Sequence, residues 1–199
     1  TPTVVRENGR AEVVFSLTEG RPVIADSVAY TGAEGLEVEG LLENLPLREG
    51  DRLSGITLDA TRDSITTRLA NRGYAFAAVY RNALRPAADP YNAVVTFDIV
   101  PGPRSTYGNI TVAGLENLSV RTILRTVQIS NGEVYRRSEI EEARARLYGL
   151  QIVRSASVEP RIRTDSLSFE QDSVIDVAIT VQEGDAYRVR AGGGWNTAE

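Results

Sequence analysis

The sequence contains no cysteine, histidine, methionine or lysine, and all 22 of its cationic side chains are arginine. Without cysteine there can be no disulfide bond, thiolate zinc site or cysteine nucleophile. Without histidine there is no Ser-His-Asp triad and no HExxH metal site, and without lysine there is no Schiff base and no P-loop. We therefore expect a protein that is not an enzyme, with no catalytic residue, metal site or cofactor.

Long apolar runs and an excess of positive charge are also missing. No apolar run approaches the ~20 residues that a membrane-spanning helix needs, and we expect no signal peptide within this sequence. The net charge is −5, whereas a surface that binds nucleic acid is normally basic. We expect no nucleic-acid partner, and an RNA-binding α/β module stays as a minor alternative. The absence of an initial Met suggests a processed or excised fragment.

Glycines recur along the chain at a fixed spacing. Three segments that alternate apolar and polar residues each end at a glycine, and the two intervals between these glycines are both 82 residues (20 to 102 and 102 to 184). Two further glycine pairs keep the same spacing. Such periodicity indicates one supersecondary unit written twice. The glycines in this register are Gly20, Gly32, Gly50, Gly102, Gly114, Gly132 and Gly184.

The first copy predicts the order β-α-α-β-β. Period-two alternation indicates strands, and apolar residues three, four or seven apart indicate helices. In chain order, the expected elements are a strand over 23–30, a helix over 36–45 that Pro46 ends, a helix with an apolar stripe of Leu58, Ile65 and Leu69, and a hairpin of strands over 75–84 and 93–100.

The second copy predicts the same order. Ser119 is a candidate N-cap, and Ser138 with Glu141 has the spacing of a capping box. In chain order, the expected elements are a strand over 107–112, a helix over 120–127, a shorter second helix with a stripe of Ile140, Ala143 and Leu147, and strands over 155–162 and 174–181.

These patterns predict an α+β fold made of tandem β-α-α-β-β modules. Each module is expected to be a three-stranded mixed sheet covered on one face by two helices, because neither layer can bury its apolar side alone. The first and last strands should be parallel and the closing hairpin antiparallel. The last strand is the most apolar, which favours a central position with the other two strands at the edges.

The expected domain organisation follows from the repeat. Residues 1–20, with the turn signal Asn8-Gly9, read as the C-terminal hairpin of a preceding module. Residues 21–102 and 103–184 are the two modules, and residues 185–199 read as a linker or the first strand of a different β structure.

The chain resembles the polypeptide-transport-associated (POTRA) domains of bacterial outer-membrane assembly factors of the BamA and TamA type. The resemblance rests on the β-α-α-β-β order, the Gly73-Tyr74 step into a strand, and Pro101-Gly102 followed by Ile110-x-Val112-x-Gly114. It also rests on Gly132-x-x-Tyr135 and on Gly192-Gly-Gly-Trp195 before a barrel. One departure is Leu150–Val153, where the family usually has a Gly-Tyr or Gly-Phe step. The motif residues are Gly32, Gly50, Gly73, Tyr74, Gly102, Gly114, Gly132 and Gly184.

The resemblance implies a periplasmic region attached to the bacterial outer membrane through its own C-terminal barrel of 16 strands. Such a region would receive unfolded outer-membrane proteins, or periplasmic and lipoprotein partner subunits, and deliver them to the barrel. A two-partner secretion transporter is the alternative, although a partial hairpin before two modules favours the assembly type.

The chemistry that remains is backbone pairing at a sheet edge. An edge strand carries unpaired N–H and C=O groups, to which an extended client can add without sequence readout. The first copy offers the better edge, because Pro160 removes a donor from the strand over 155–162. The expected client-binding residues are Ala77, Ala78, Val79, Tyr80, Arg81, Asn82, Ala83 and Leu84.

Overall fold

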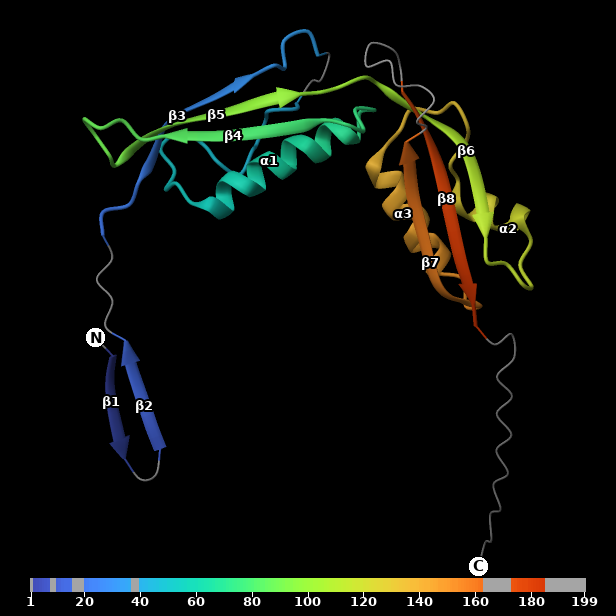
Figure 1. Cartoon of the computed structure of the whole chain (residues 1–199), viewed down its shortest axis with the longest axis horizontal. Coiled ribbons are helices and arrows are strands. Elements are labelled where there is room, and N and C mark those ends of the chain that lie inside the picture. The colour runs from blue at the N-terminus through green and yellow to red at the C-terminus, as the bar shows by residue number, and fades with distance from the viewer. Residues whose placement is uncertain (1, 8–9, 16–19, 37–39, 163–172, 185–199) are drawn as a thin grey trace, which may run out of the picture.

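The computed structural model describes residues 2–7, 10–15, 20–36, 40–162 and 173–184. Figure 1 shows a hairpin followed by two modules, each with its own three-stranded sheet. The hairpin pairs β1 (Pro2–Glu7) with β2 (Arg10–Phe15), as the Asn8-Gly9 signal predicted. The expectation for residues 185–199 lies outside the described residues.

The first module is built on a mixed sheet with the strand order β3-β5-β4. Its strands are β3 (Ile24–Thr31), β4 (Ala78–Leu84) and β5 (Asn92–Val100). The central β5 pairs in parallel with β3 and antiparallel with β4, as predicted. Alternate residues of β5 are buried, and Phe97 lies at the centre of the module's core, where Tyr30 stacks on it.

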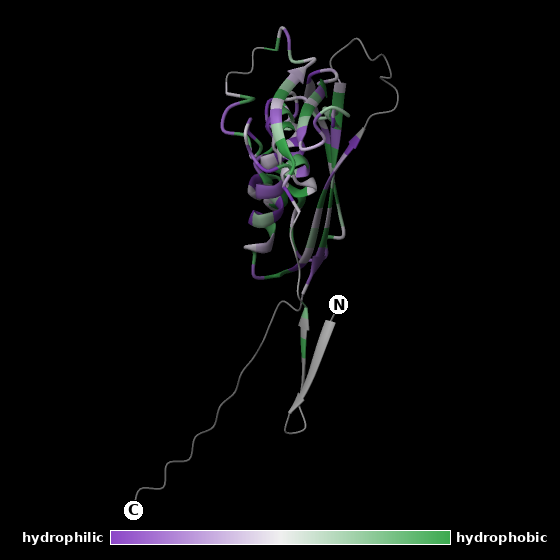
Figure 2. Ribbon diagram, turned by 90° about the vertical axis from the view of Figure 1, so that its left-hand side faces the viewer, coloured by the Kyte–Doolittle hydropathy of each residue, from purple (hydrophilic) through white to green (hydrophobic). Residues whose placement is uncertain are grey.

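The second module repeats this sheet with the order β6-β8-β7. Its strands are β6 (Ser105–Ala113), β7 (Val153–Ile162) and β8 (Ser173–Glu183). The central β8 is parallel to β6 and antiparallel to β7, so the predicted topology is confirmed in both copies. Apolar positions recur along the strands of both sheets, coloured green in Figure 2.

One long helix, α1 (Gly55–Ala70), packs on the sheet of the first module. It begins at Ser54, whose hydroxyl accepts the Thr57 backbone N–H in a capping box. The predicted stripe is confirmed, because the stripe residues of this helix are all buried. They are Leu58, Ile65 and Leu69.

The helix predicted over 36–45 is not present in the described part of that segment, which forms turns over residues 40–44. Two residues have positive φ, Gly40 at 72° and Asn44 at 47°, and this backbone cannot continue a right-handed helix. The apolar residues that suggested a helix are nevertheless in the core, since Leu41 and Leu45 are buried. Burial therefore explains the apolar pattern without helical periodicity.

Two helices cover the sheet of the second module. Helix α2 (Val120–Val127) has the predicted bounds, and the predicted N-cap Ser119 accepts the Thr122 N–H. Helix α3 (Arg137–Tyr148) is four residues shorter than α1, 12 against 16, as expected. The capping box predicted for Ser138 and Glu141 is wrong, because the helix already begins before Ser138 and its N-cap Arg136 makes no side-chain cap bond.

The repeated glycines have repeated environments. Gly32 has φ of +77° and Gly114 has φ of +82°, conformations that favour glycine. A Cβ atom on either residue would lie 2.1 Å from a carbonyl oxygen of the central strand, that of Ile99 in the first module and that of Val181 in the second. The spacing of 82 residues thus preserves one close approach of a turn to the central strand.

The end of β8 is tied to the loop before α2 through the Glu183 carboxylate, which accepts backbone N–H bonds from Glu116, Asn117 and Leu118. Desolvation works to raise the pKa of Glu183, but these three donors outweigh it and lower the pKa to about 2.

This low pKa predicts an acid-sensitive loop. Because the folded pKa lies below the ordinary value of 4.5, the stabilisation is complete above that pH and is lost as the pH falls towards 2. In an NMR titration, the amide protons of Asn117 and Leu118 should shift with a midpoint near pH 2. Glu183→Gln should abolish that titration, and a midpoint near 4.5 would contradict the bonding.

Within the described residues, no helix is both long and apolar enough to cross a bilayer.

Candidate binding edge and the joint between the modules

The predicted client-binding strand is an open edge of the first sheet. Strand β4 pairs only with β5, so no described strand covers its other side. Ala77, the first residue of the predicted segment, lies just before the strand, where its N–H donates to the Tyr74 carbonyl. The seven residues of β4 pair with β5 without a register shift. The backbone groups on the outer side of β4 therefore form a regular row.

Alternate side chains of β4 lie on opposite faces of the sheet. Val79 is buried against the core, and Arg81 points to the helix side, where its Nε is 2.9 Å from Oδ1 of Asp59 on α1. Tyr80 and Leu84 face away from the helix and are 63% and 65% exposed. A strand that adds to β4 would place alternate side chains beside these two residues.

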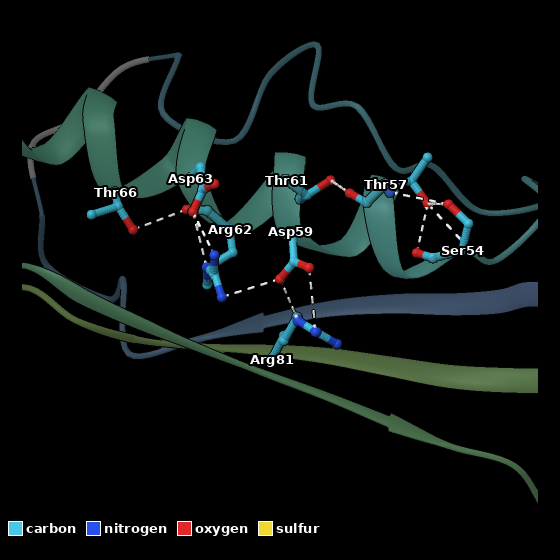
Figure 3. A network of polar contacts seen from close by, with 8 residues as sticks. All are labelled: Ser54, Thr57, Asp59, Thr61, Arg62, Asp63, Thr66 and Arg81. Atoms are coloured by element: carbon cyan, nitrogen blue, oxygen red, sulfur yellow. Dashed lines mark hydrogen bonds and ion pairs between the residues drawn. The ribbon is translucent and has the colours of Figure 1, made fainter.

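Figure 3 draws the polar contacts of α1, which include one ion pair to β4 and two ion pairs within the helix. Asp59 accepts from Arg81 and lies 3.1 Å from the guanidinium of Arg62, which in turn donates to Asp63. Each of these side chains is more than a third exposed, so each pair contributes ~0–1 kcal/mol. The network links the edge strand to the helix and offers no acid–base chemistry.

The opposite edge of the first sheet is obstructed. The Ala25 N–H donates to the Asp51 carbonyl at 2.9 Å, and its carbonyl accepts the Gly50 N–H at 2.8 Å. The chain at Gly50, which has φ of +87°, thus covers the start of β3. A register shift between Ala25 and Ser27 further interrupts this edge. Bulged and covered edges pair poorly with an added strand.

The second module repeats this obstruction. The Tyr107 N–H donates to the Glu133 carbonyl and its carbonyl accepts the Gly132 N–H, both at 2.8 Å. Strand β6 also has a register shift between Tyr107 and Ile110. Gly50 and Gly132, noticed in the sequence only for their spacing, are therefore part of the segments that cover the first strands.

The remaining edge, β7, is irregular. Its pairing with β8 shifts register between Val153 and Ser155, and Pro160 lies opposite Val177 with no N–H to donate. Of the four edges of the two three-stranded sheets, β4 is thus the one that is neither covered nor bulged and carries no proline in its described residues.

The outer faces of the two sheets differ in chemistry. In the first module, Leu84 lies opposite Val94, and both side chains are exposed. At the equivalent place in the second module, Arg161 lies opposite Asp176. The exposed outer residues of the first module also include Tyr80 and Val100. The outer face of the first sheet thus carries these exposed apolar residues together with the polar Asn82 and Asp98, whereas the equivalent end of the second sheet carries an arginine and an aspartate.

The two modules are joined by specific contacts at the end of α1. The Gly73 carbonyl accepts the Ser105 N–H at 2.7 Å, and the Asn71 Oδ1 accepts the Ser138 N–H at 2.9 Å. Ser138 is the second residue of α3, the position that an N-cap side chain normally serves. Asn71, a residue of the first module, thus supplies the acceptor that the N-cap of α3 lacks. Sequence spacing could not reveal this nonlocal contact.

Close packing supports this joint. A Cβ atom on Gly73, which has φ of +98°, would lie 2.8 Å from Val134 Cγ1 and 3.2 Å from Arg104 Cγ. Ala70, at the end of α1, belongs to the core of the second module, and Ala75 and Phe76 pack against that core. The second module is therefore completed by residues that precede it in the chain.

A buried tyrosine holds the start of α3 from inside the second module. The Tyr107 hydroxyl donates to the Arg136 carbonyl at 2.8 Å and accepts the Arg136 N–H at 3.1 Å. Burial raises the pKa of Tyr107, so the hydroxyl stays protonated and keeps its donor. Tyr135 packs against the ring at a centroid distance of 5.4 Å.

The cap across the joint predicts a local effect of Asn71→Ala. Loss of the acceptor for the Ser138 N–H should destabilise the first turn of α3 by ~1 kcal/mol. Hydrogen exchange of residues 138–140 measures this, with the exposed Asn131 replaced by alanine as the control. Equal exchange in both variants would show that the bond does not cap the helix.

In the described part of the chain, no three carboxylates lie close enough together to hold a metal ion.

Comparison with known proteins supports this architecture. The family model described as POTRA, surface antigen variable number repeat, matches residues 23–102 and 105–184. POTRA3–5 of Haemophilus influenzae BamA shares the fold with a TM-score of 0.65 and 21% identity, over 92% of this chain and 71% of that one. BamA of Haemophilus ducreyi lacking POTRA domains 1–3 has a TM-score of 0.64 and 17% identity, over 82% of this chain and 29% of that one.

A comparison with curated protein sequences finds no match. The family match nevertheless covers most of the chain, in two segments that coincide with the two sheets and their helices. The chain therefore belongs to the POTRA family, of which it carries two domains in tandem.

Proposed function

We propose that this chain is the periplasmic POTRA region of an outer-membrane protein assembly or translocation factor. In this role it binds unfolded outer-membrane proteins by strand addition along β4 and passes them to a C-terminal membrane barrel. Periplasmic or lipoprotein subunits are further partners of this region. Family membership and the fold shared with BamA POTRA arrays support the setting of the proposal.

One observation carries the choice of β4 within the chain. Among the described edges of the two three-stranded sheets, it is the one whose ladder is regular and whose outer side is free of the covering loop, bulge and proline seen elsewhere. Backbone pairing needs such a row and reads no side-chain sequence. That suits a protein that must receive many unfolded clients.

The exposed apolar residues on the outer face suit the same clients. Strands of membrane barrels alternate apolar and polar side chains. When such a strand adds to β4, its apolar residues can lie beside Tyr80 and Leu84, and its polar residues lie on the side of Arg81. The charged pair Arg161–Asp176 gives the second module no equivalent surface.

Hydrogen exchange of the 199-residue chain, with and without a urea-unfolded outer-membrane protein diluted into buffer, tests the proposal. Client should slow the exchange of β4 amides and leave those of β7 unchanged. Protection confined to β7, or to neither strand, would reject the β4 site.

Adjacent proline substitutions sharpen the test. Backbone N–H groups alternate between the two sides of a strand, so one of Asn82→Pro and Ala83→Pro removes a donor from the open side and the other removes one bonded to β5. The variant that keeps the melting temperature should bind the client ~tenfold more weakly, about one hydrogen bond's contribution. Unchanged affinity in that variant would exclude pairing along β4.

A double substitution tests whether the outer face of the first sheet contributes to client binding, and the second module supplies the replacement residues. Leu84→Arg with Val94→Asp copies the pair Arg161–Asp176 into the first module. We expect the double variant to stay folded, since both positions are exposed, and to bind an alternating apolar client several-fold more weakly. If the double variant binds the client with unchanged affinity, the client is recognised by the backbone of β4 alone.

A further inference from the structure

A cleft of about 500 Å³ lies at the joint between the two modules. Both modules line it: Asn71, Arg72 and Tyr74 come from the first, and Arg104 and Arg136 from the second. Figure 1 shows this region where the C-terminal end of α1 approaches the second module. No described residue that lines the cleft carries a carboxylate, although the whole chain has a net charge of −5.

Two of the three arginines, Arg104 and Arg136, retain donors for a ligand. No hydrogen bond or ion pair joins the Arg104 guanidinium to another described residue, and its side chain lies over Gly73. Arg136 uses one nitrogen on Glu139 at 3.4 Å. Because a guanidinium has five N–H donors, a single contact of this length leaves most of the group available. Arg72 adds a third positive charge to the cleft wall.

Two neighbouring features add to the positive potential. Asn71 is held by its Oδ1 through the bond to the Ser138 N–H, so its amide nitrogen keeps both hydrogens for another acceptor. The N-terminus of the 12-residue α3 lies at Arg136, and its partial positive charge favours an anion there.

We propose that this cleft binds a phosphate-bearing ligand. A carboxylate has one charge and two oxygens, which one guanidinium can satisfy in a bidentate pair. A phosphate group has up to two charges and three or four oxygens, which the guanidiniums of Arg104 and Arg136, with the added positive charge of Arg72, match better. The volume of about 500 Å³ exceeds what one orthophosphate fills, and so favours a pyrophosphate or a phosphorylated head group.

Such a ligand would bridge the modules. Arg72 comes from the end of α1, whereas Arg104 and Arg136 belong to the second module. Neutralising all three arginines at once removes their mutual repulsion and adds contacts across the joint beside the Asn71 cap. Occupancy should therefore fix the angle between the modules, independently of strand addition at β4.

Isothermal titration of the 199-residue chain with pyrophosphate, in buffered NaCl of roughly physiological ionic strength, tests the site. We expect saturable binding that Arg104→Gln weakens ~tenfold or more, because charge-assisted hydrogen bonds are lost. Arg121→Gln changes the net charge equally but replaces an exposed arginine on α2, so it should leave the affinity unchanged. Absence of saturable binding, or equal effects of the two substitutions, would overturn the proposal.

Two further measurements identify the kind of molecule that carries the phosphate group. The chain can also be sedimented with phosphatidylglycerol vesicles. If it binds the vesicles, and if both added pyrophosphate and Arg104→Gln reduce this binding, the site is assigned to a lipid head group. Pyrophosphate binding without vesicle binding would assign it to a soluble phosphate. A polyglutamate peptide that binds more tightly than pyrophosphate would overturn the phosphate assignment in favour of an acidic polypeptide.

Discussion

Gly32→Ala should strongly destabilise the first module, although the residue lies at the surface. The residue has φ of +77°, which costs a side chain of L-configuration about 1–2 kcal/mol. Its Cβ would also lie 2.1 Å from the Ile99 carbonyl oxygen, and the required shift of the central strand adds about 1–3 kcal/mol. The free energy of unfolding should fall by about 2–5 kcal/mol in total, as measured by urea denaturation.

A second glycine separates the two causes. Gly50 has φ of +87°, but no atom lies within 4 Å of the place that its Cβ would occupy, so Gly50→Ala should cost only the conformational part. Gly114→Ala should repeat the large effect in the second module, because its Cβ would meet the Val181 carbonyl oxygen at the same distance. Equal losses for Gly32→Ala and Gly50→Ala would show that the close approach does not matter.

Phe97→Ala is expected to reach beyond its own module. Phe97 is fully buried in the central strand, and truncation of such a residue costs about 3–5 kcal/mol. Its counterpart 82 residues later is Ile179, also buried in a central strand, for which truncation costs about 2–5 kcal/mol. The repeat therefore offers a matched pair of core substitutions, one in each module.

The two substitutions should differ in where their effects appear. The second core includes Ala70 with Ala75 and Phe76 packed against it, whereas the first core contains only residues of the first module. Unfolding of the first module thus removes part of the second core, whereas unfolding of the second module removes no residue from the first core. Native-state hydrogen exchange in mild urea should show faster exchange of α3 in Phe97→Ala, and unchanged exchange of β5 in Ile179→Ala. Effects confined to the mutated module in both variants would contradict this dependence.

The sequence was sufficient to predict those features that depend on local periodicity. Alternating apolar residues predicted the central strands, because these are buried on the helix side through every second residue, as at Phe97 and Ile179. The stripe that contains Leu147 predicted α3 because it packs against a single sheet. The spacing of 82 residues predicted the repeat because the turns at Gly32 and Gly114 approach the central strands of their modules in the same way.

The features that could not be predicted depend on contacts between distant segments. The helix expected over 36–45 fails because turns at Gly40 and Asn44 bury the same leucines without helical geometry. The cap of α3 was misplaced because its acceptor, Asn71, lies 67 residues before Ser138. The cleft likewise needs the fold, since it gathers arginines that are far apart in the chain and read individually as surface charge.

The loops that cover the starts of β3 and β6 also limit how copies of this protein can associate. A sheet with two open sides can grow into a filament by pairing at both. Within the described residues β4 is the regular edge of the first sheet, whereas the start of β3 is covered and bulged. Pairing of β4 with β4 of another copy therefore uses the regular edge of both copies and closes as a symmetric pair. Pro160 and the bulge in β7 hinder continuation through the second sheet. The molecule can thus offer backbone to a passing chain at high concentration without polymerising through its two module sheets.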